Sequence, residues 1–172
     1  MKKRPETDTA KDNRAKMQPS AEDRQAAEHV KALQIRINTC FVAVILPAVF
    51  DVENDLHQAG YWNRLDIDQT TTPGTGKPDI KKVSVFFYPE NTDNFSHSPG
   101  KIDATYQAHI FAAGNLRDIV FSIRFPKRIP PLVEIEDLII AVEDIDPQTV
   151  NGFLERFVKG ALDAYNSDRM LR

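Results

Sequence analysis

Residues 104–125, ATYQAHIFAAGNLRDIVFSIRF, hold two runs of alternating apolar and polar residues on either side of Gly114 and Asn115. Glycine and asparagine both tolerate the positive φ of a tight turn, so this pair predicts a two-residue hairpin loop. Pairing outward from the loop then joins apolar partners on one face: Ile110 with Ile119, Ala108 with Phe121, Tyr106 with Ile123, and Ala104 with Phe125. A slip of one residue would exchange the two faces, so the pattern specifies which face is buried.

Strand-like runs lie on both sides of this hairpin. Before it come NRLDIDQ (63–69) and KKVSVFFYPE (81–90), each followed by a segment rich in turn-forming residues. After it, LVEIEDLIIAVEDI (132–145) predicts a fifth strand, whose alternation changes phase at Asp137 as a bulge would make it do. Five consecutive strands with no helical segment between them predict an antiparallel meander.

A helix is predicted at each end of this strand region. Ser20 and Asp23 form a capping signature, and apolar residues then recur at steps of three and four as far as Ala59. Pro47 interrupts this pattern and predicts a kink or break near Leu46. Asp146 and Pro147 predict the start of a second helix. Its wide apolar stripe suits a position across a sheet, and consists of Val150, Phe153, Leu154, Phe157, Val158, Ala161, Leu162 and Tyr165.

These elements predict an α+β fold with a long kinked N-terminal helix, a five-stranded antiparallel meander sheet and a C-terminal helix. Both helices are expected on one face of the sheet, because only one face of the hairpin is consistently apolar. Residues 20–172 are expected to form a single domain. Residues 1–19 contain almost nothing that could be buried and are expected to be a disordered polar tail.

The most apolar run extends from Cys40 to Phe50. As a helix it would span about 16 Å, whereas a bilayer core needs about 20 apolar residues. Cys40 is the only cysteine, so no disulfide framework of the kind common in secreted domains is possible within the chain. We therefore expect a buried core helix, no membrane partner and a cytoplasmic location.

Charge is distributed unevenly along the chain, whose formal net charge is −3. Residues 1–36 carry nine basic and six acidic residues, so the remainder is distinctly acidic. A basic cluster around the fourth strand, formed by Arg117, Arg124, Lys127 and Arg128, lies beside the acidic residues of the fifth. Pairing of these charges across the sheet is the simpler interpretation, so a nucleic-acid partner is not expected.

Few residues suggest chemistry. The four histidines are not at metal-ligand spacing, so neither a metal nor another cofactor is expected. Ser122 and His109 share the polar face of the hairpin, and with an acidic residue they could form a nucleophilic set. The sequence lacks the Gly-x-Ser-x-Gly elbow that would support such a set, and TPGTGKPD (72–79) lacks the spacing of a phosphate-binding loop. No catalytic residue is predicted, and the chain is expected not to be an enzyme.

Two functions remain. Apolar residues on the sheet face opposite the core predict a non-enzymatic protein-interaction module, adaptor or chaperone-like, whose partner is another protein or a second copy in a homodimer. Its interface candidates are Phe86, Tyr88, Phe111 and Val120. The alternative is a helix-grip binder of a small apolar ligand. Its cavity would be lined by Tyr106, Phe121, Ile123, Phe157 and Tyr165.

Overall fold

The structure, a computed structural model, describes residues 20–71, 78–91, 105–126 and 135–170. A continuous helix opens the chain as α1 (Ala21–Cys40), the π-helical turn η1 (Phe41–Ile45) and α2 (Leu46–Gln58). The strands are β1 (Tyr61–Thr71), β2 (Pro78–Asn91), β3 (Tyr106–Ala112), β4 (Asp118–Arg124) and β5 (Ile135–Ala141). A 3₁₀ turn, η4 (Val142–Asp144), leads into α3 (Pro147–Met170). The predicted tail, residues 1–19, lies outside the described residues.

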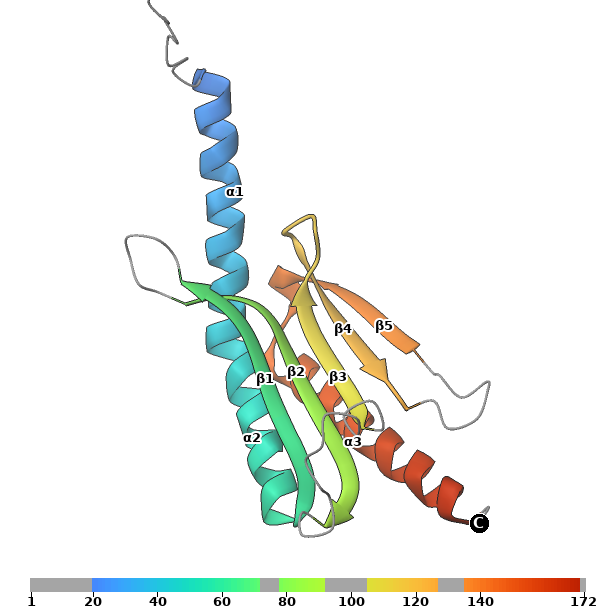
Figure 1. The fold of residues 1–172 in the computed structure, drawn as a ribbon. Coiled ribbons are helices and arrows are strands. Elements are labelled where there is room, and N and C mark those ends of the chain that lie inside the picture. The colour runs from blue at the N-terminus through green and yellow to red at the C-terminus, as the bar shows by residue number, and fades with distance from the viewer. Residues whose placement is uncertain (1–19, 72–77, 92–104, 127–134, 171–172) are drawn as a thin grey trace, which may run out of the picture.

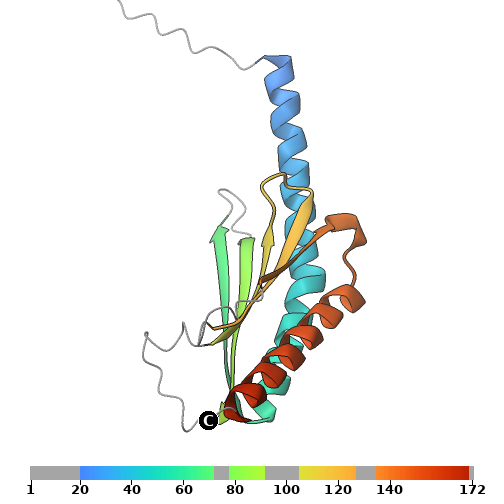
Figure 2. The ribbon, with the colours of Figure 1, turned by 90° about the vertical axis from the view of Figure 1, so that its right-hand side faces the viewer.

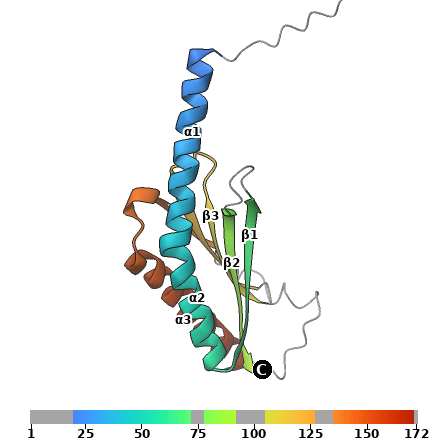
Figure 3. The same ribbon diagram turned by 90° about the vertical axis from the view of Figure 1, so that its left-hand side faces the viewer.

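The strands form one antiparallel sheet in the order β1-β2-β3-β4-β5 (Figure 1). Viewed from the side, α2 and α3 lie together on one face of this sheet, and the opposite face carries no described helix (Figures 2 and 3). The predicted α+β architecture is therefore confirmed. The first turns of α1 extend beyond the end of the sheet as a free arm (Figure 1).

The long helix begins at the predicted cap. The Ser20 side chain accepts a hydrogen bond from the Asp23 backbone N–H at 3.1 Å, and the Asp23 carboxylate accepts one from the Ser20 backbone N–H at 3.0 Å. The irregularity predicted at Pro47 takes the form of the π turn η1 rather than a break. A wider turn relieves the clash between the proline ring and the preceding carbonyls, so the helix continues to Gln58.

The β3–β4 hairpin has a longer loop than predicted. His109 pairs with Ser122 and Ile110 with Phe121, which is two residues from the predicted register. The backbone N–H of Ala113 donates to the Asp118 carbonyl at 2.9 Å, so four residues, 114–117, form the loop. Asn115 selects this loop because its side-chain oxygen accepts from the backbone N–H groups of Arg117 and Asp118, at 2.9 and 3.2 Å. A shift of two keeps every side chain on its predicted face.

The core lies between the sheet and the two helices. Val83, Val85 and Phe87 of β2 face inward, as do Ile110 of β3 and Phe121 of β4, and all five are buried. The fifth strand shows no bulge, because its pairing with β4 is continuous through Asp137. Its change of phase instead reflects its place at the edge of the sheet, where both Leu138 and Ile139 are exposed.

Candidate interaction site

The outer face of the sheet, opposite the helices, is organised in rows that cross all five strands. One row begins with Asp68 and Lys82 and continues through three apolar residues. We term these three the apolar row: Phe111, Val120 and Ile139. The next row, termed the polar row, contains Asp66, Ser84, His109, Ser122 and Asp137. Side chains that face each other across strands lie about 5 Å apart, so each row is a continuous surface.

The apolar row ends at β5, whose outer edge pairs with no other described strand. Phe111 and Val120 are half-buried, whereas the Ile139 side chain is 64% exposed and its neighbour Leu138 37%. The other edge strand, β1, carries charged residues on the outer face instead. Among them, the Arg64 guanidinium donates a hydrogen bond to the Asp66 carboxylate at 2.7 Å. Charged edges resist pairing with another chain, whereas apolar edges invite it. The two edges of this sheet therefore differ in their capacity to bind a strand.

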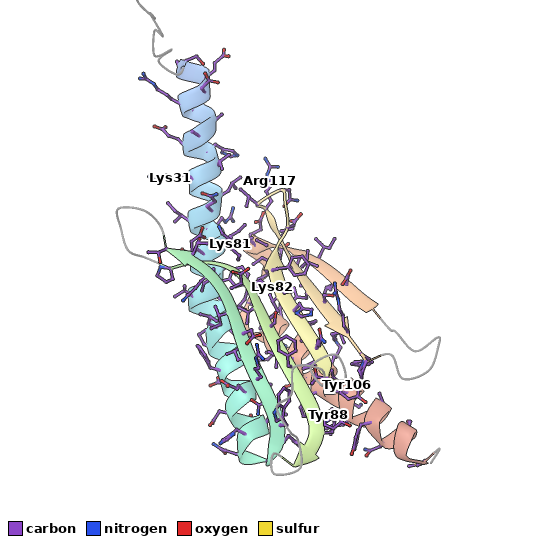
Figure 4. The ribbon with its side chains drawn as sticks, in the orientation of Figure 1. Lys31, Lys81, Lys82, Tyr88, Tyr106 and Arg117 are labelled. Atoms are coloured by element: carbon purple, nitrogen blue, oxygen red, sulfur yellow. The ribbon has the colours of Figure 1, made fainter. Side chains whose placement is uncertain are left out.

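The structure groups only two of the four predicted interface residues. Phe111 and Val120 are direct neighbours in the apolar row. Phe86 lies two rows away, half-buried, with the Arg64 guanidinium 5.7 Å from its ring centroid. Tyr88 does not belong to an exposed surface: it is 8% exposed, and its ring contacts Tyr165 of α3 edge-on at 5.7 Å. The placement of Tyr88 on the open outer face is thus corrected, and Figure 4 shows it at the end of the sheet near α3.

His109 occupies the centre of the polar row and is 5% exposed. Its Nδ1 lies 2.9 Å from Ser84 Oγ, and its Nε2 lies 3.1 Å from Gln107 Oε1. A neutral imidazole protonated on Nε2 satisfies both contacts, with Ser84 donating and Gln107 accepting. Burial lowers the pKa of His109 to about 4, and the positive charges of Lys82 and Arg124 act in the same direction.

This arrangement differs from the nucleophilic set considered from the sequence. Ser84, not Ser122, contacts His109, while the buried Ser122 hydroxyl has no hydrogen-bond partner among the described residues. The nearest carboxylates of the row, Asp66 and Asp137, each lie two strands from His109, about 10 Å away. A histidine whose pKa is so low is a weak general base at neutral pH. The described residues also contain no group of three potential metal ligands.

The residues predicted to line a ligand cavity pack closely in the core. Phe121 and Phe157 are fully buried, and Phe121 contacts Phe153 of α3 edge-on at 5.1 Å. The Tyr106 and Phe125 rings are also nearly perpendicular, with their centroids 5.2 Å apart. Ile123 and Tyr165 are buried too, at 4% and 6% exposure. All five side chains are therefore buried in the packed core between the sheet and α3, and the ligand-binding alternative gains no support from them.

Described residues line at least two cavities that open at the surface. One, of about 460 Å³, is a groove between α2 and α3, with Val52, Leu56, Leu154, Val158 and Leu162 among its apolar lining residues. The other, of about 360 Å³, lies between the middle of α1 and the β3–β4 loop, where Leu33 and Arg36 approach Leu116 and Arg117. None of the five predicted cavity residues lines either of them.

The long helix is long and apolar enough to cross a membrane by length and composition alone. Of its most apolar 18-residue stretch, 33% is buried within the domain. The remainder includes Ile35, Val42 and Phe50, which are 59%, 47% and 45% exposed. This exposed apolar side was not predicted from the sequence, although a helical run that is apolar in every direction indicates that more than one face is covered.

Comparison with protein-family models, curated proteins and solved structures gave no match.

Proposed function

We propose that the chain is a non-enzymatic, self-associating protein-interaction module, of adaptor or chaperone-like kind, whose β5 edge takes up an extended segment of a partner protein. The observation that carries this proposal is the apolar row, which leads across the outer face to Ile139 at the sheet edge. A strand added to β5 would hydrogen-bond with the backbone groups along its outer edge, which no described strand occupies, and would lay alternate side chains over that row.

The contrast between the two edges supports β5 as the docking strand. An added strand on β1 would meet Arg64, Asp66 and Asp68 on the outer face. On β5 it would meet Asp137 on the outer face, and next to it Leu138 and Ile139, one apolar side chain on each face. Main-chain pairing supplies affinity at either edge, but only the β5 edge adds apolar burial on both sides.

The polar row supports a role without catalysis. His109 is buried and held neutral, its ring nitrogens are engaged by Ser84 and Gln107, and neither carboxylate of the row is near enough to orient it. The contacts among Ser84, His109 and Gln107 satisfy the polar groups of these three side chains and give the sheet a rigid centre. The proposal also includes a cytoplasmic location, which the short apolar run and the single cysteine favour.

Selection from a surface-displayed library of random peptides tests the proposal. Peptides enriched on the wild-type chain should carry apolar residues at alternate positions and should shift the backbone amide resonances of residues 135–141. Ile139→Lys should weaken their binding by about tenfold or more, because it places a charge under the added strand. Thr70→Lys, at an exposed position of the β1 edge, is the matched control and should leave binding unchanged.

Thermal unfolding of the Ile139→Lys variant should match the wild type, because this side chain contributes little to the core. The proposal fails if enriched peptides bind Ile139→Lys as well as wild type. It also fails if their resonance shifts fall on helices rather than on β5.

A further inference from the structure

The middle of the long helix carries a second apolar stripe, on the side away from the sheet. Its members are all exposed, and we term them the outward stripe: Ile35, Thr39, Val42, Ala43, Pro47 and Phe50. They alternate around the helix with Ile37, Phe41, Ile45 and Val49, which are buried against the domain. Even the polar member fits, since the Thr39 hydroxyl donates within the helix to the Ile35 carbonyl at 2.8 Å.

A helix that is apolar on all sides is normally covered on all sides. From Ile35 to Phe50 the outward stripe is about 22 Å long, which is enough for helix–helix packing over four turns. The arm, residues 21–32, also needs a partner. These residues are exposed throughout and have little tertiary packing to hold them helical. A partner along this side of the helix would cover the stripe and support the arm.

The charges at the two ends of the stripe identify the partner. Lys31 and Arg36 lie at its N-terminal end, and Asp51 and Glu53 lie at its C-terminal end. A parallel pair of such helices would bring like charges together, whereas an antiparallel pair brings opposite charges together. The stripe is therefore complementary to itself in one orientation only. Lys31 stands on the free part of α1, clear of the sheet (Figure 4).

We propose that two copies of the chain pair through their outward stripes, antiparallel, about a two-fold axis between Val42 and Ala43. Ile35 then lies opposite the partner's Phe50. Lys31 approaches the partner's Glu53 and Arg36 approaches the partner's Asp51, one pair on each flank. This interface specifies the self-association named in the proposed function and rests on that part of it. It is separate from the β5 edge, so strand docking and helix pairing can each fail without the other.

Arg36 remains available for this contact. It lies 3.3 Å from Glu143 in its own chain, but both side chains are 55% exposed. An exposed pair of this kind contributes at most about 1 kcal/mol, so it does not prevent Arg36 from sharing its guanidinium with a second carboxylate. A guanidinium between Glu143 and the partner's Asp51 would have an acid on each side.

A second copy fits the helix better than a bilayer does. The opposite side of the helix packs on the sheet through Ile37, Phe41 and Ile45. Asn38 also joins the helix to β2, donating to the Pro78 carbonyl at 2.9 Å and accepting from the Ile80 backbone N–H at 3.0 Å. Insertion into lipid would break these contacts, because a bilayer core surrounds a spanning helix with apolar chains. A second helix covers the stripe without disturbing them.

Sedimentation equilibrium of the full chain tests the pairing. A helix pair with a contact about 22 Å long buries an area at the lower end of the range for stable interfaces. We therefore expect a dimer that dissociates in the micromolar range. Val42→Glu places two like charges beside the two-fold axis and should raise the dissociation constant about a hundredfold. Val30→Lys is the matched control, because Val30 has similar exposure on the same helix but lies outside the stripe.

Charge reversal tests the orientation. Lys31→Glu with Arg36→Glu should weaken the dimer, and adding Asp51→Lys with Glu53→Lys to the same chain should restore it. Cysteine cross-linking gives an independent measure: Ile35→Cys mixed with Phe50→Cys should form a disulfide between the two variants, and neither variant should form one alone. Cys40 is buried and does not interfere.

Three results would overturn the proposal. One is a wild-type chain that stays monomeric at hundreds of micromolar. Another is cross-linking of each cysteine variant with itself, which indicates a parallel pair. The third is co-flotation of the wild-type chain with phosphatidylcholine vesicles that Val42→Glu abolishes, which would assign the stripe to a lipid surface.

Discussion

His109 shows how a polar residue can be held inside an otherwise open sheet face. Its two ring nitrogens contact Ser84 and Gln107, and the Phe86 ring lies nearly perpendicular to it with the ring centroids 6.1 Å apart. Protonation would convert Nδ1 from an acceptor to a donor and place a positive charge near Lys82 and Arg124. The neutral form is therefore part of the folded state.

Stability should fall as the solution is acidified through this titration. The folded-state pKa of His109, about 4, lies below its ordinary value of 6.5, so the unfolded chain binds the proton more readily. The contribution of neutral His109 to the free energy of unfolding is complete above pH 6.5 and is lost as the pH falls towards 4. The loss should be on the order of 2 to 3 kcal/mol in the free energy of unfolding.

Urea unfolding of wild type and His109→Gln at pH 7.5 and pH 4.5 checks this prediction. The variant should lose less stability between the two pH values, because glutamine does not titrate. Carboxylates such as Asp23 and Asp146, whose pKa values are lowered by hydrogen bonds at helix starts, are common to both proteins and cancel. An equal loss in the two proteins would show that His109 is not the titrating group.

The sequence predicted only part of this cluster. Alternation along the hairpin placed His109, Gln107 and Ser122 on one face, and the structure has them there. The contact with Ser84 depends on the register between β2 and β3, and no turn adjoining both strands specifies it in the sequence. Local alternation determines a face, whereas a partner across a long connection depends on tertiary packing.

At the scale of the element, the β3–β4 hairpin shows that a loop is selected by side-chain hydrogen bonds as well as by backbone tolerance. Glycine followed by asparagine suited a two-residue loop, but Asn115 instead satisfies two backbone N–H groups of a longer one. Leu116 takes the positive φ, at 56°, that closes it. The predicted register was wrong for this reason, while the predicted faces survived.

Asn115→Ala should destabilise the protein by about 1 kcal/mol, because it removes the acceptor of two backbone N–H groups at the turn. Asn151→Ala, at an exposed position of α3, is the control and should change stability far less. Urea unfolding midpoints measure both. If the two variants are equally stable, the Asn115 contacts do not determine the loop.

The helices illustrate what periodicity can and cannot reveal. The caps at Ser20 and Asp146 were visible as short motifs, and both side chains accept the expected backbone hydrogen bonds. The buried stripe was visible too. The outward stripe was not recognised, because a periodic pattern identifies the face that is buried but does not indicate how much apolar surface stays exposed on the other faces.

At the scale of the whole molecule, strand order followed from the absence of helices between the strands, which left a meander as the simplest antiparallel topology. Helix placement followed from the single apolar face of the sheet. The free arm could not be foreseen, because its pattern is continuous with the buried stripe below it. Only the length of the sheet determines where packing stops.

Removal of residues 1–19 should leave the melting temperature within about 1 °C of the full chain, because the segment contains too little apolar surface to stabilise the fold. Ser20 keeps its capping contacts in the shortened chain. Differential scanning calorimetry measures the change. A loss of several degrees would show that the tail docks on the domain.

The full chain should also be recovered in the soluble fraction without detergent, because a third of the most apolar helical stretch is committed to the core. Fractionation after expression measures this. A folded protein found only in the membrane fraction would contradict it.

The π turn has a further consequence in terms of the gene. A wide turn of this kind has the geometry of one residue inserted into an ordinary helix. Loss of a single codon within Phe41–Ile45 would restore regular winding and rotate the whole arm by about 100° around the helix axis. Ile37 would then swing off the sheet, and Ile35 would leave the line of Val42 and Phe50. One codon thus keeps the two stripes in phase along the helix, and a change in chain length there would alter both surfaces at once.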